Sequence, residues 1–304
     1  MFKSFSNGWQ LVKASYNVLK QDKELMIFPL LSTIAVIAVT IVMMIPLSAM
    51  GIFESTETAT TASQASSSGP NGFVLFLLAF LFYFIMYTIV IFCNTALVGA
   101  AMIRLDGGDP TVQDGFRIAS ERVGAIIGYA AIAATVGMIL QGLQNAARES
   151  DNMAVAIIGS IFTGLLEVAW NLITFLVVPV LVMERVGPID AIKRSGSLLK
   201  QTWGENIAAS FSMGVIQFLV MLLIGIVVGV PMIMLASSAG GVVAFLAIAV
   251  LVVLLGFVAL FFATLNGIFQ AALYKWATAE TPEEKHQVGV FFDESMIRNA
   301  FVHK

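Results

Sequence analysis

Two stretches of the chain, VKASYNVLKQ (residues 12–21) and IKRSGSLLKQ (residues 192–201), carry the same residue at five of ten positions. The offset between them is 180 residues, and each is followed, after a few polar residues, by a long apolar run. Self-similarity of this kind indicates a repeated structural unit. The unit predicted here is a short cytoplasmic amphipathic helix followed by two helices that span a membrane.

A third copy lies between the two, because DGFRIASERVG (residues 114–124) aligns with DAIKRSGSLLK (residues 190–200). The matched positions are Asp114 with Asp190, Arg117 with Lys193, and Ala119 with Ser195. We therefore expect a single membrane domain over residues 1–304. It would consist of three parallel repeats and a cytoplasmic tail, with bounds at residues 1–107, 108–186, 187–278 and 279–304.

The composition restricts the class of protein. Of the 304 residues, 59% are hydrophobic and 12% are charged, and this charged share is about half that of an average soluble domain. These values exclude a soluble globular enzyme, and a net charge of −3 provides no basic surface for nucleic acid. With one cysteine and two histidines, the chain offers almost nothing for a metal or redox centre, so we expect neither metal nor cofactor.

Six apolar stretches are long enough to cross a bilayer, which requires about 20 residues. All six are predicted to be helices, so the expected fold is all-α. Their bounds are residues 27–53, 73–103, 123–143, 153–183, 207–235 and 242–274. Pro46, Pro179 and Pro231 are expected to distort these helices locally, because proline lacks the N–H group that a helix needs.

The basic residues predict the orientation. If the N-terminus lies in the cytoplasm and the chain crosses six times, 15 of the 16 Lys and Arg residues are cytoplasmic and Arg148 is outside. This bias follows the positive-inside rule. We therefore expect a multi-pass protein of the cytoplasmic (inner) membrane with both termini in the cytoplasm. The expected partners are membrane lipids, a further copy of the chain or another membrane protein.

The short helix of each repeat is expected to be amphipathic. Trp9, Val12, Tyr16 and Leu19 share one face of the first helix, and Ile189, Ile192 and Leu199 share one face of the third. The residues expected at the membrane interface are Trp9, Lys13, Lys20, Arg117, Lys193 and Lys200. Two arrangements fit: the helices lie along the membrane surface, or they insert between the spans and close the bundle from the cytoplasm.

The run GWQLVKASYNVLKQDKELMIFPLLS (residues 8–32) resembles the opening of an uncharacterised family of six-span membrane proteins from bacteria and archaea. AALYKWA (residues 271–277) and the ending FFDESMIRNAFVHK (residues 291–304) resemble the C-terminal signature of that family. More distantly, residues 184–206 are similar to loops in the membrane domains attached to some glycerophosphodiester phosphodiesterases, a similarity that carries no catalytic residues. The resemblance implies a multi-pass membrane protein with no assigned activity.

Glu167 is the one acidic residue expected inside a span, near the middle of the fourth. A carboxylate at that depth is strongly unfavourable unless it is protonated, paired or hydrated. Asn171 follows at i+4 and shares its face. Two interpretations stay open: a proton-carrying or cation-binding site that faces a polar cavity, or a protonated Glu167 that hydrogen-bonds Asn171, Gln141 or Gln217.

Three amides form a second polar group. Asn266 and Gln270 are an i, i+4 pair toward the cytoplasmic end of the last span, and Asn94 is the counterpart of Asn266 in the second span. Amides of this kind usually hydrogen-bond across helix interfaces and contribute about 0.6–2 kcal/mol each. The alternative is that the three amides line one cytoplasmic vestibule.

The sequence contains no HExxH, GxSxG or Walker motif, so we expect no enzyme. Two functions fit the remaining features. The first, which the sequence favours, is a structural, scaffold or partner-binding component of the membrane that works without turnover and assembles with itself or another protein. The second is a channel or transporter in which Glu167 lines a polar path.

Overall fold

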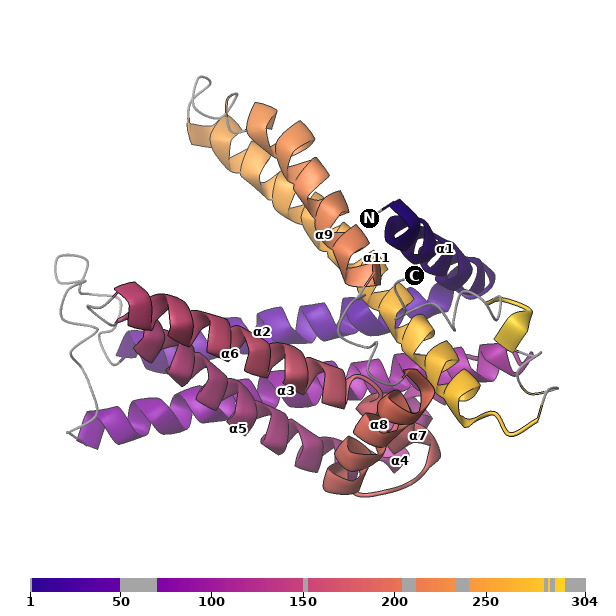
Figure 1. Cartoon of the computed structure of the whole chain (residues 1–304). Coiled ribbons are helices and arrows are strands. Elements are labelled where there is room, and N and C mark those ends of the chain that lie inside the picture. The colour runs from indigo at the N-terminus through magenta and orange to yellow at the C-terminus, as the bar shows by residue number, and fades with distance from the viewer. Residues whose placement is uncertain are drawn as a thin grey trace.

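The computed structural model describes residues 2–49, 70–149, 153–203, 212–232, 234, 241–281, 284 and 288–292. Within these residues the fold is all-α, as predicted (Figure 1). The elements are α1 (Phe2–Gln21), the 3₁₀-helix η1 (Lys23–Met26), α2 (Ile27–Ala49), α3 (Pro70–Leu105), α4 (Val112–Glu121), α5 (Val123–Arg148), α6 (Met153–Thr174), α7 (Val177–Met183), α8 (Pro188–Trp203), α9 (Ser212–Ile224), the π-helix η3 (Gly225–Gly229) and α11 (Gly241–Thr278).

Five helical segments of the described chain are long and apolar enough to cross a membrane. They are Lys23–Pro46, Gly72–Leu105, Val123–Arg148, Ala156–Met183 and Gly241–Thr278. The predicted fifth span corresponds to a shorter apolar helix, Ile216–Met232. Residues 204–211 and 235–240, which include its expected ends, lie outside the described residues. The predicted fifth span, and with it the total of six, therefore stays a prediction.

Helix α3 occupies the centre of the fold, since it packs against α2, α4, α5, α7 and α11. It has 36 residues and is about 54 Å long at 1.5 Å per residue. Helices α2, α3, α5 and α6 form a bundle, whereas α9 and the adjoining part of α11 extend away from it as a hairpin (Figure 1). We call this pair the α9–α11 hairpin; it contacts α1 near its base.

The buried core lies at one end of the bundle. It combines α1, the last part of α3, the start of α5, α7, α8 and the second half of α11, and includes Leu97, Ile126, Leu181, Leu198 and Ile268. Val288 and Phe292 of the tail are buried in the same core. The remaining parts of α2, α3, α6, α9 and α11 expose many large apolar side chains. This distribution is expected of helices that meet lipid along most of their length.

The fourth predicted span is divided where Pro179 distorts it. A proline has no N–H group and its ring clashes with the carbonyl four residues earlier, here that of Phe175. Helix α6 accordingly ends at Thr174 and α7 begins at Val177. The N–H group of Leu176, in the gap, donates instead to the hydroxyl oxygen of Ser195 on α8 at 3.0 Å. The expected distortion at Pro179 is confirmed.

The other two prolines behave differently from each other. Pro231 follows the π-helix η3, in which the N–H of Val230 bonds the carbonyl of Gly225. This wider turn is a local departure from α-helical geometry of the kind expected beside a proline. Pro46 lies within α2, which continues as an α-helix to Ala49. The expected distortion at Pro46 does not interrupt its helix.

The amphipathic helices pack on the spans with one face. Helix α1 contacts α9 and α11, α4 contacts α3, and α8 contacts α6 and α7. The predicted interface residues all have exposed side chains: Trp9, Lys13, Lys20, Arg117, Lys193 and Lys200. The predicted apolar stripes were partly wrong, because Trp9, Tyr16 and Ile189 are exposed while Leu11, Val18 and Leu198 are buried. The helix face that packs on the spans therefore includes Leu11 and Val18 in α1 and Leu198 in α8.

Ion pairs join distant segments at the end of the bundle that contains the core. Arg104 at the end of α3 pairs with Asp22 and Asp109, and Lys275 of α11 pairs with Asp106. Arg194 of α8 pairs with Glu184 at 2.8 Å, and Arg185 lies 3.8 Å from Glu121. We call the region defined by these nine residues the charged end of the protein.

Candidate functional site

The five predicted site residues fall into two separate pockets that share one wall, α3. Glu167 and Asn171 line a pocket between α3, α5 and α6, which we call the Glu167 pocket. Asn94, Asn266 and Gln270 line a pocket between α2, α3 and α11, which we call the amide pocket. Val90 of α3 contributes to both. The structure therefore brings the three amides together and keeps them apart from Glu167.

The Glu167 pocket has a volume of about 410 Å³, within the range of small-molecule sites. Most of the groups that line it can form hydrogen bonds or present an aromatic ring. They are Tyr83, Tyr87, Tyr129, Gln141, Gln144, Thr163, Glu167, Trp170, Asn171 and Thr174. Polar side chains are uncommon inside membrane-spanning helices, and Gln141, Glu167 and Asn171 are exposed, so this polar pocket opens on the surface of the bundle.

Part of the hydrogen-bonding capacity of the pocket is used internally. The Tyr83 hydroxyl donates to the Oε1 atom of Gln141 at 2.5 Å and thereby joins α3 to α5. The hydroxyls of Thr163 and Thr174 donate to carbonyls of their own helix, of Gly159 and Trp170. A hydroxyl that donates within its helix can still accept a hydrogen bond from a ligand.

The acidic group of the pocket is Glu167. Among the described residues that line it, there is no Lys, Arg or His to neutralise a carboxylate. Gln141 and Asn171, two of the three neutral partners that the sequence suggests, line the same pocket, but Gln217 lies in α9 and does not. The pocket thus offers one acidic group surrounded by neutral hydrogen-bonding groups and aromatic rings.

Sequence reasoning missed the aromatic part of this pocket. Tyr83 and Tyr87 stand at i, i+4 on one helix, and Tyr129 faces them from α5, so three of the five tyrosines in the chain line the pocket. From the sequence, we considered only carboxamide partners of Glu167 and therefore did not include these tyrosines. The i, i+4 tyrosine pair in an otherwise apolar span was the available signal.

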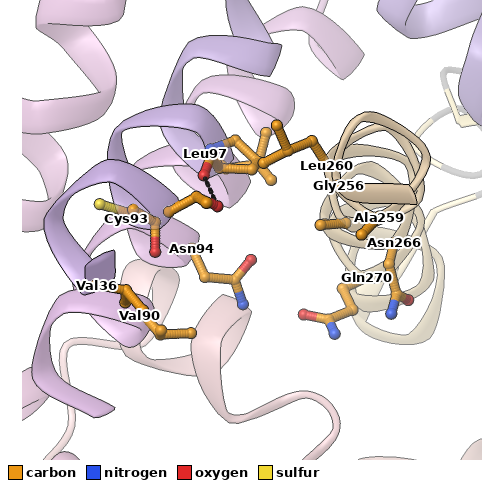
Figure 2. A pocket seen from close by; sticks show the side chains of 15 residues that line it. Val36, Val90, Cys93, Asn94, Leu97, Gly256, Ala259, Leu260, Asn266 and Gln270 are labelled. Atoms are coloured by element: carbon orange, nitrogen blue, oxygen red, sulfur yellow. Dashed lines mark hydrogen bonds between the residues drawn. The ribbon is translucent and has the colours of Figure 1, made fainter. Parts of the chain in front are cut away.

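The amide pocket has a volume of about 480 Å³. Figure 2 shows Asn94 on α3 on one side and Asn266 and Gln270 on α11 on the other. Ser32, Thr33 and Cys93 add further polar atoms, and small or aliphatic residues such as Gly256, Ala263 and Val36 complete the walls. The three amides therefore line one open space, and the prediction that this space is a cytoplasmic vestibule stays a prediction.

One atom of the amide pocket lacks a partner. The Oε1 atom of Gln270 is buried and has no hydrogen-bond partner among the described residues. A buried carbonyl oxygen without a donor is unfavourable by about 1–3 kcal/mol. In native structures such an atom calls for an explanation, and a bound molecule that donates a hydrogen bond is one.

Neither pocket has the side chains of a metal centre. In the part of the chain that the structure describes, no group of three or more His, Cys, Asp or Glu residues is placed to hold a metal ion. The groups present at both sites can bind a ligand by hydrogen bonds, and those of the Glu167 pocket also by aromatic faces and one carboxylate.

The five long apolar helices and their polar pockets indicate a multi-pass membrane protein. The chain belongs to a family of unknown function, DUF6159, whose family model matches residues 73–283. The match includes both pockets apart from the contribution of α2, and the motif at residues 271–277 lies inside it. No curated protein matches the chain.

Proposed function

We propose that the protein is a channel or transporter in which the Glu167 pocket binds a proton or a small cation. The observation that carries this proposal is an acidic side chain in a polar pocket of about 410 Å³ whose described lining includes no basic residue. Of the two functions that the sequence leaves open, this geometry favours the second.

The surroundings of Glu167 suit a cation. Tyr83, Tyr87, Tyr129 and Trp170 supply aromatic rings, which attract cations by about 0.5–2 kcal/mol each. Asn171 and Gln144 supply carbonyl oxygens that can accept hydrogen bonds from an ammonium group. An ionised carboxylate in a membrane-spanning helix is stable only with a counter-charge or water, so the bound cation and Glu167 would stabilise each other.

The test is flux through the purified protein in liposomes. The wild-type protein should carry protons, read by an entrapped pH dye, or methylammonium, read by uptake, and Glu167→Gln should abolish the flux. Glu149→Gln is the matched control, because Glu149 is exposed at the end of α5 outside the pocket. Wild-type flux no greater than that of protein-free liposomes, or equal flux in Glu167→Gln, would overturn the proposal.

A second function is favoured by the α9–α11 hairpin. It extends away from the bundle and exposes apolar side chains including Phe218, Leu223, Val253 and Phe257. Such a surface suits a scaffold or partner-binding component that assembles in the membrane with a second copy or another membrane protein. Native mass measurement in lipid nanodiscs tests self-assembly: dimers or larger species support it, and a strictly monomeric particle contradicts it.

We also propose the full topology of six spans in three parallel repeats, with both termini on the cytoplasmic side of the cell membrane. Burial supports the repeats, since Leu11, Ser15, Val18 and Leu19 are buried and so are their counterparts at an offset of 180, Ala191, Ser195, Leu198 and Leu199. Gly115 and Ala119 are buried at the positions equivalent to Ala191 and Ser195. Reporter fusions after Lys304 and after Arg148 should give cytoplasmic and external signals, respectively.

The distant similarity to membrane domains of glycerophosphodiester phosphodiesterases adds no activity to this proposal. In those proteins catalysis belongs to a soluble domain, which the residues in question do not include.

A further inference from the structure

We infer that the amide pocket binds an uncharged amphiphile whose head carries hydroxyl and carbonyl groups, of the diacylglycerol type. This site lies on the α2–α11 side of α3 and is independent of Glu167.

The polar groups of the pocket match a neutral head. Among the described residues that line it there is no Lys, Arg, His, Asp or Glu. A charged head group would therefore lose its hydration without gaining a counter-charge, which is strongly unfavourable. The carboxamides of Asn94, Asn266 and Gln270 each offer an acceptor oxygen and two N–H donors. A hydroxyl group can donate to an amide oxygen, and an ester carbonyl can accept from an amide N–H.

The unpartnered oxygen identifies the atom to which a ligand hydroxyl would donate. The Oε1 atom of Gln270 is buried without a hydrogen-bond donor among the described residues. A ligand hydroxyl that donates to this atom would remove the free-energy penalty of leaving it unpaired. In Figure 2 the Gln270 and Asn94 side chains extend from opposite walls, so one head group placed between them could contact both.

The other walls suit an acyl chain. Gly256, Ala259 and Ala263 line α11 where it faces the pocket, and Val36 and Val90 line the opposite helices. A Cβ atom built on Gly256 would meet no heavy atom within 4 Å, so open space lies next to this position. Apolar walls with a few polar groups at one point are the usual composition of a site for an amphipathic ligand.

The position of the pocket fits a head group without charge. Asn94 precedes Arg104 by ten residues and Asn266 precedes Lys275 by nine residues on their helices. At 1.5 Å per residue, Asn94 and Asn266 lie about 14–15 Å from the basic residue of their helix, and Gln270, five residues before Lys275, lies about 8 Å from it. If the charged end marks the membrane interface, the amides lie within the hydrocarbon region, whose half-thickness is about 15 Å. A diacylglycerol can enter that region without carrying a charge into it.

The test uses photo-cross-linking in phosphatidylcholine nanodiscs with a diazirine-bearing diacylglycerol, followed by peptide mapping. Cross-links should concentrate on α2, α3 and α11 and fall several-fold when unlabelled diacylglycerol competes. Gln270→Met and Asn266→Leu keep the side-chain volume and remove hydrogen-bonding groups, so each should reduce the pocket cross-links at least three-fold. A phosphatidylglycerol probe with the same diazirine should not label the pocket.

One further variant that blocks the site and two controls separate loss of the site from loss of the fold. Gly256→Leu should block the cavity, whereas Gly142→Leu, also without heavy atoms within 4 Å of its Cβ, lies outside the pocket and should leave labelling unchanged. Glu167→Gln should label like the wild type, because it belongs to the other pocket. Unfolding temperatures confirm that each variant is folded. Equal labelling of wild type and Gly256→Leu would overturn the inference. So would labelling of the pocket by the phosphatidylglycerol probe that equals labelling by the diacylglycerol probe.

Discussion

The hydroxyl oxygen of Ser195 accepts a 3.0 Å hydrogen bond from the backbone N–H of Leu176. Both residues are fully buried, and the bond joins α8 to the gap between α6 and α7. Pro179 causes that gap, and Ser195 satisfies one of the backbone groups that the gap leaves without a helical partner. An amphipathic helix thus stabilises a broken span by a specific contact as well as by apolar packing.

Replacement of Ser195 by alanine should destabilise the protein by about 1–3 kcal/mol, because the buried N–H of Leu176 would lose its acceptor. The measurement is thermal or denaturant unfolding of the purified protein in detergent. Ser197→Ala is the matched control, since the Ser197 hydroxyl lies on the same helix and accepts only from the exposed side chain of Gln201. Equal stabilities of the two variants would contradict the role assigned to Ser195.

The pairing of Asp22 with Arg104 should contribute more than the pairs on helix surfaces. The Asp22 side chain is only 8% exposed, and it receives two hydrogen bonds from the guanidinium of Arg104. Asp22→Asn should therefore lower the free energy of unfolding by about 1.5–3 kcal/mol. Asp190→Asn removes an exposed pair at 3.7 Å with Lys193 and should change it by less than about 1 kcal/mol. The same unfolding assay compares the two variants. A larger loss of stability in Asp190→Asn than in Asp22→Asn would contradict the role assigned to the Asp22–Arg104 pair.

Gly115 lies where α4 meets α2 and α3 too closely for any side chain. A Cβ atom there would come within 2.7 Å of the Ala96 carbonyl oxygen, which is backbone and cannot rotate away. Gly115→Ala should destabilise the protein by about 1–3 kcal/mol through overpacking. Gly124→Ala, where no heavy atom lies within 4 Å, should be neutral or stabilising by up to about 1 kcal/mol. If Gly115→Ala proves as stable as Gly124→Ala, the close contact is not present in solution.

The start of α4 should respond to pH. The hydroxyl and the N–H of Thr111 both bond the carboxylate of Asp114 and lower the pKa of Asp114 below its ordinary value, with a smaller contribution from Arg117. A carboxyl with a lowered pKa in the folded state stabilises the fold above the unfolded pKa, about 3.9, and this contribution is lost as pH falls through the folded pKa.

Thr111→Val removes one of these bonds, and its destabilisation should therefore be greater at pH 7 than at pH 3. Unfolding temperatures of both proteins across this range provide the measurement. A difference between wild type and variant that does not change with pH would mean that the bond from the Thr111 hydroxyl to the Asp114 carboxylate does not stabilise the cap.

The architecture was largely predictable because membrane spans have a strong local signal. Length and apolarity alone identify the helices that contain α2, α3, α5, α6 and α11, and the break near Pro179 follows from the chemistry of proline. The pairing of Ser195 with Leu176 was not predictable, since it depends on how α8 docks, which a one-dimensional pattern does not contain.

The pockets were predictable only in part for the same reason. Glu167 and Asn171 share a helix, and the i, i+4 spacing places them together. Asn94 could be linked to Asn266 through the repeat, and both line the amide pocket. The tyrosines of the Glu167 pocket come from α3 and α5, and only the packing of these helices brings them to α6.

The continuity of α11 connects regions that would otherwise be independent. Its 38 residues run without interruption from the exposed hairpin to the charged end, and Gly267 packs so closely on Leu97 that a Cβ atom would overlap that side chain. Gly267 lies between Asn266 and Gln270 on α11, and Leu97 follows Asn94 by three residues on α3. This close contact therefore holds the two polar walls of the amide pocket at a fixed separation.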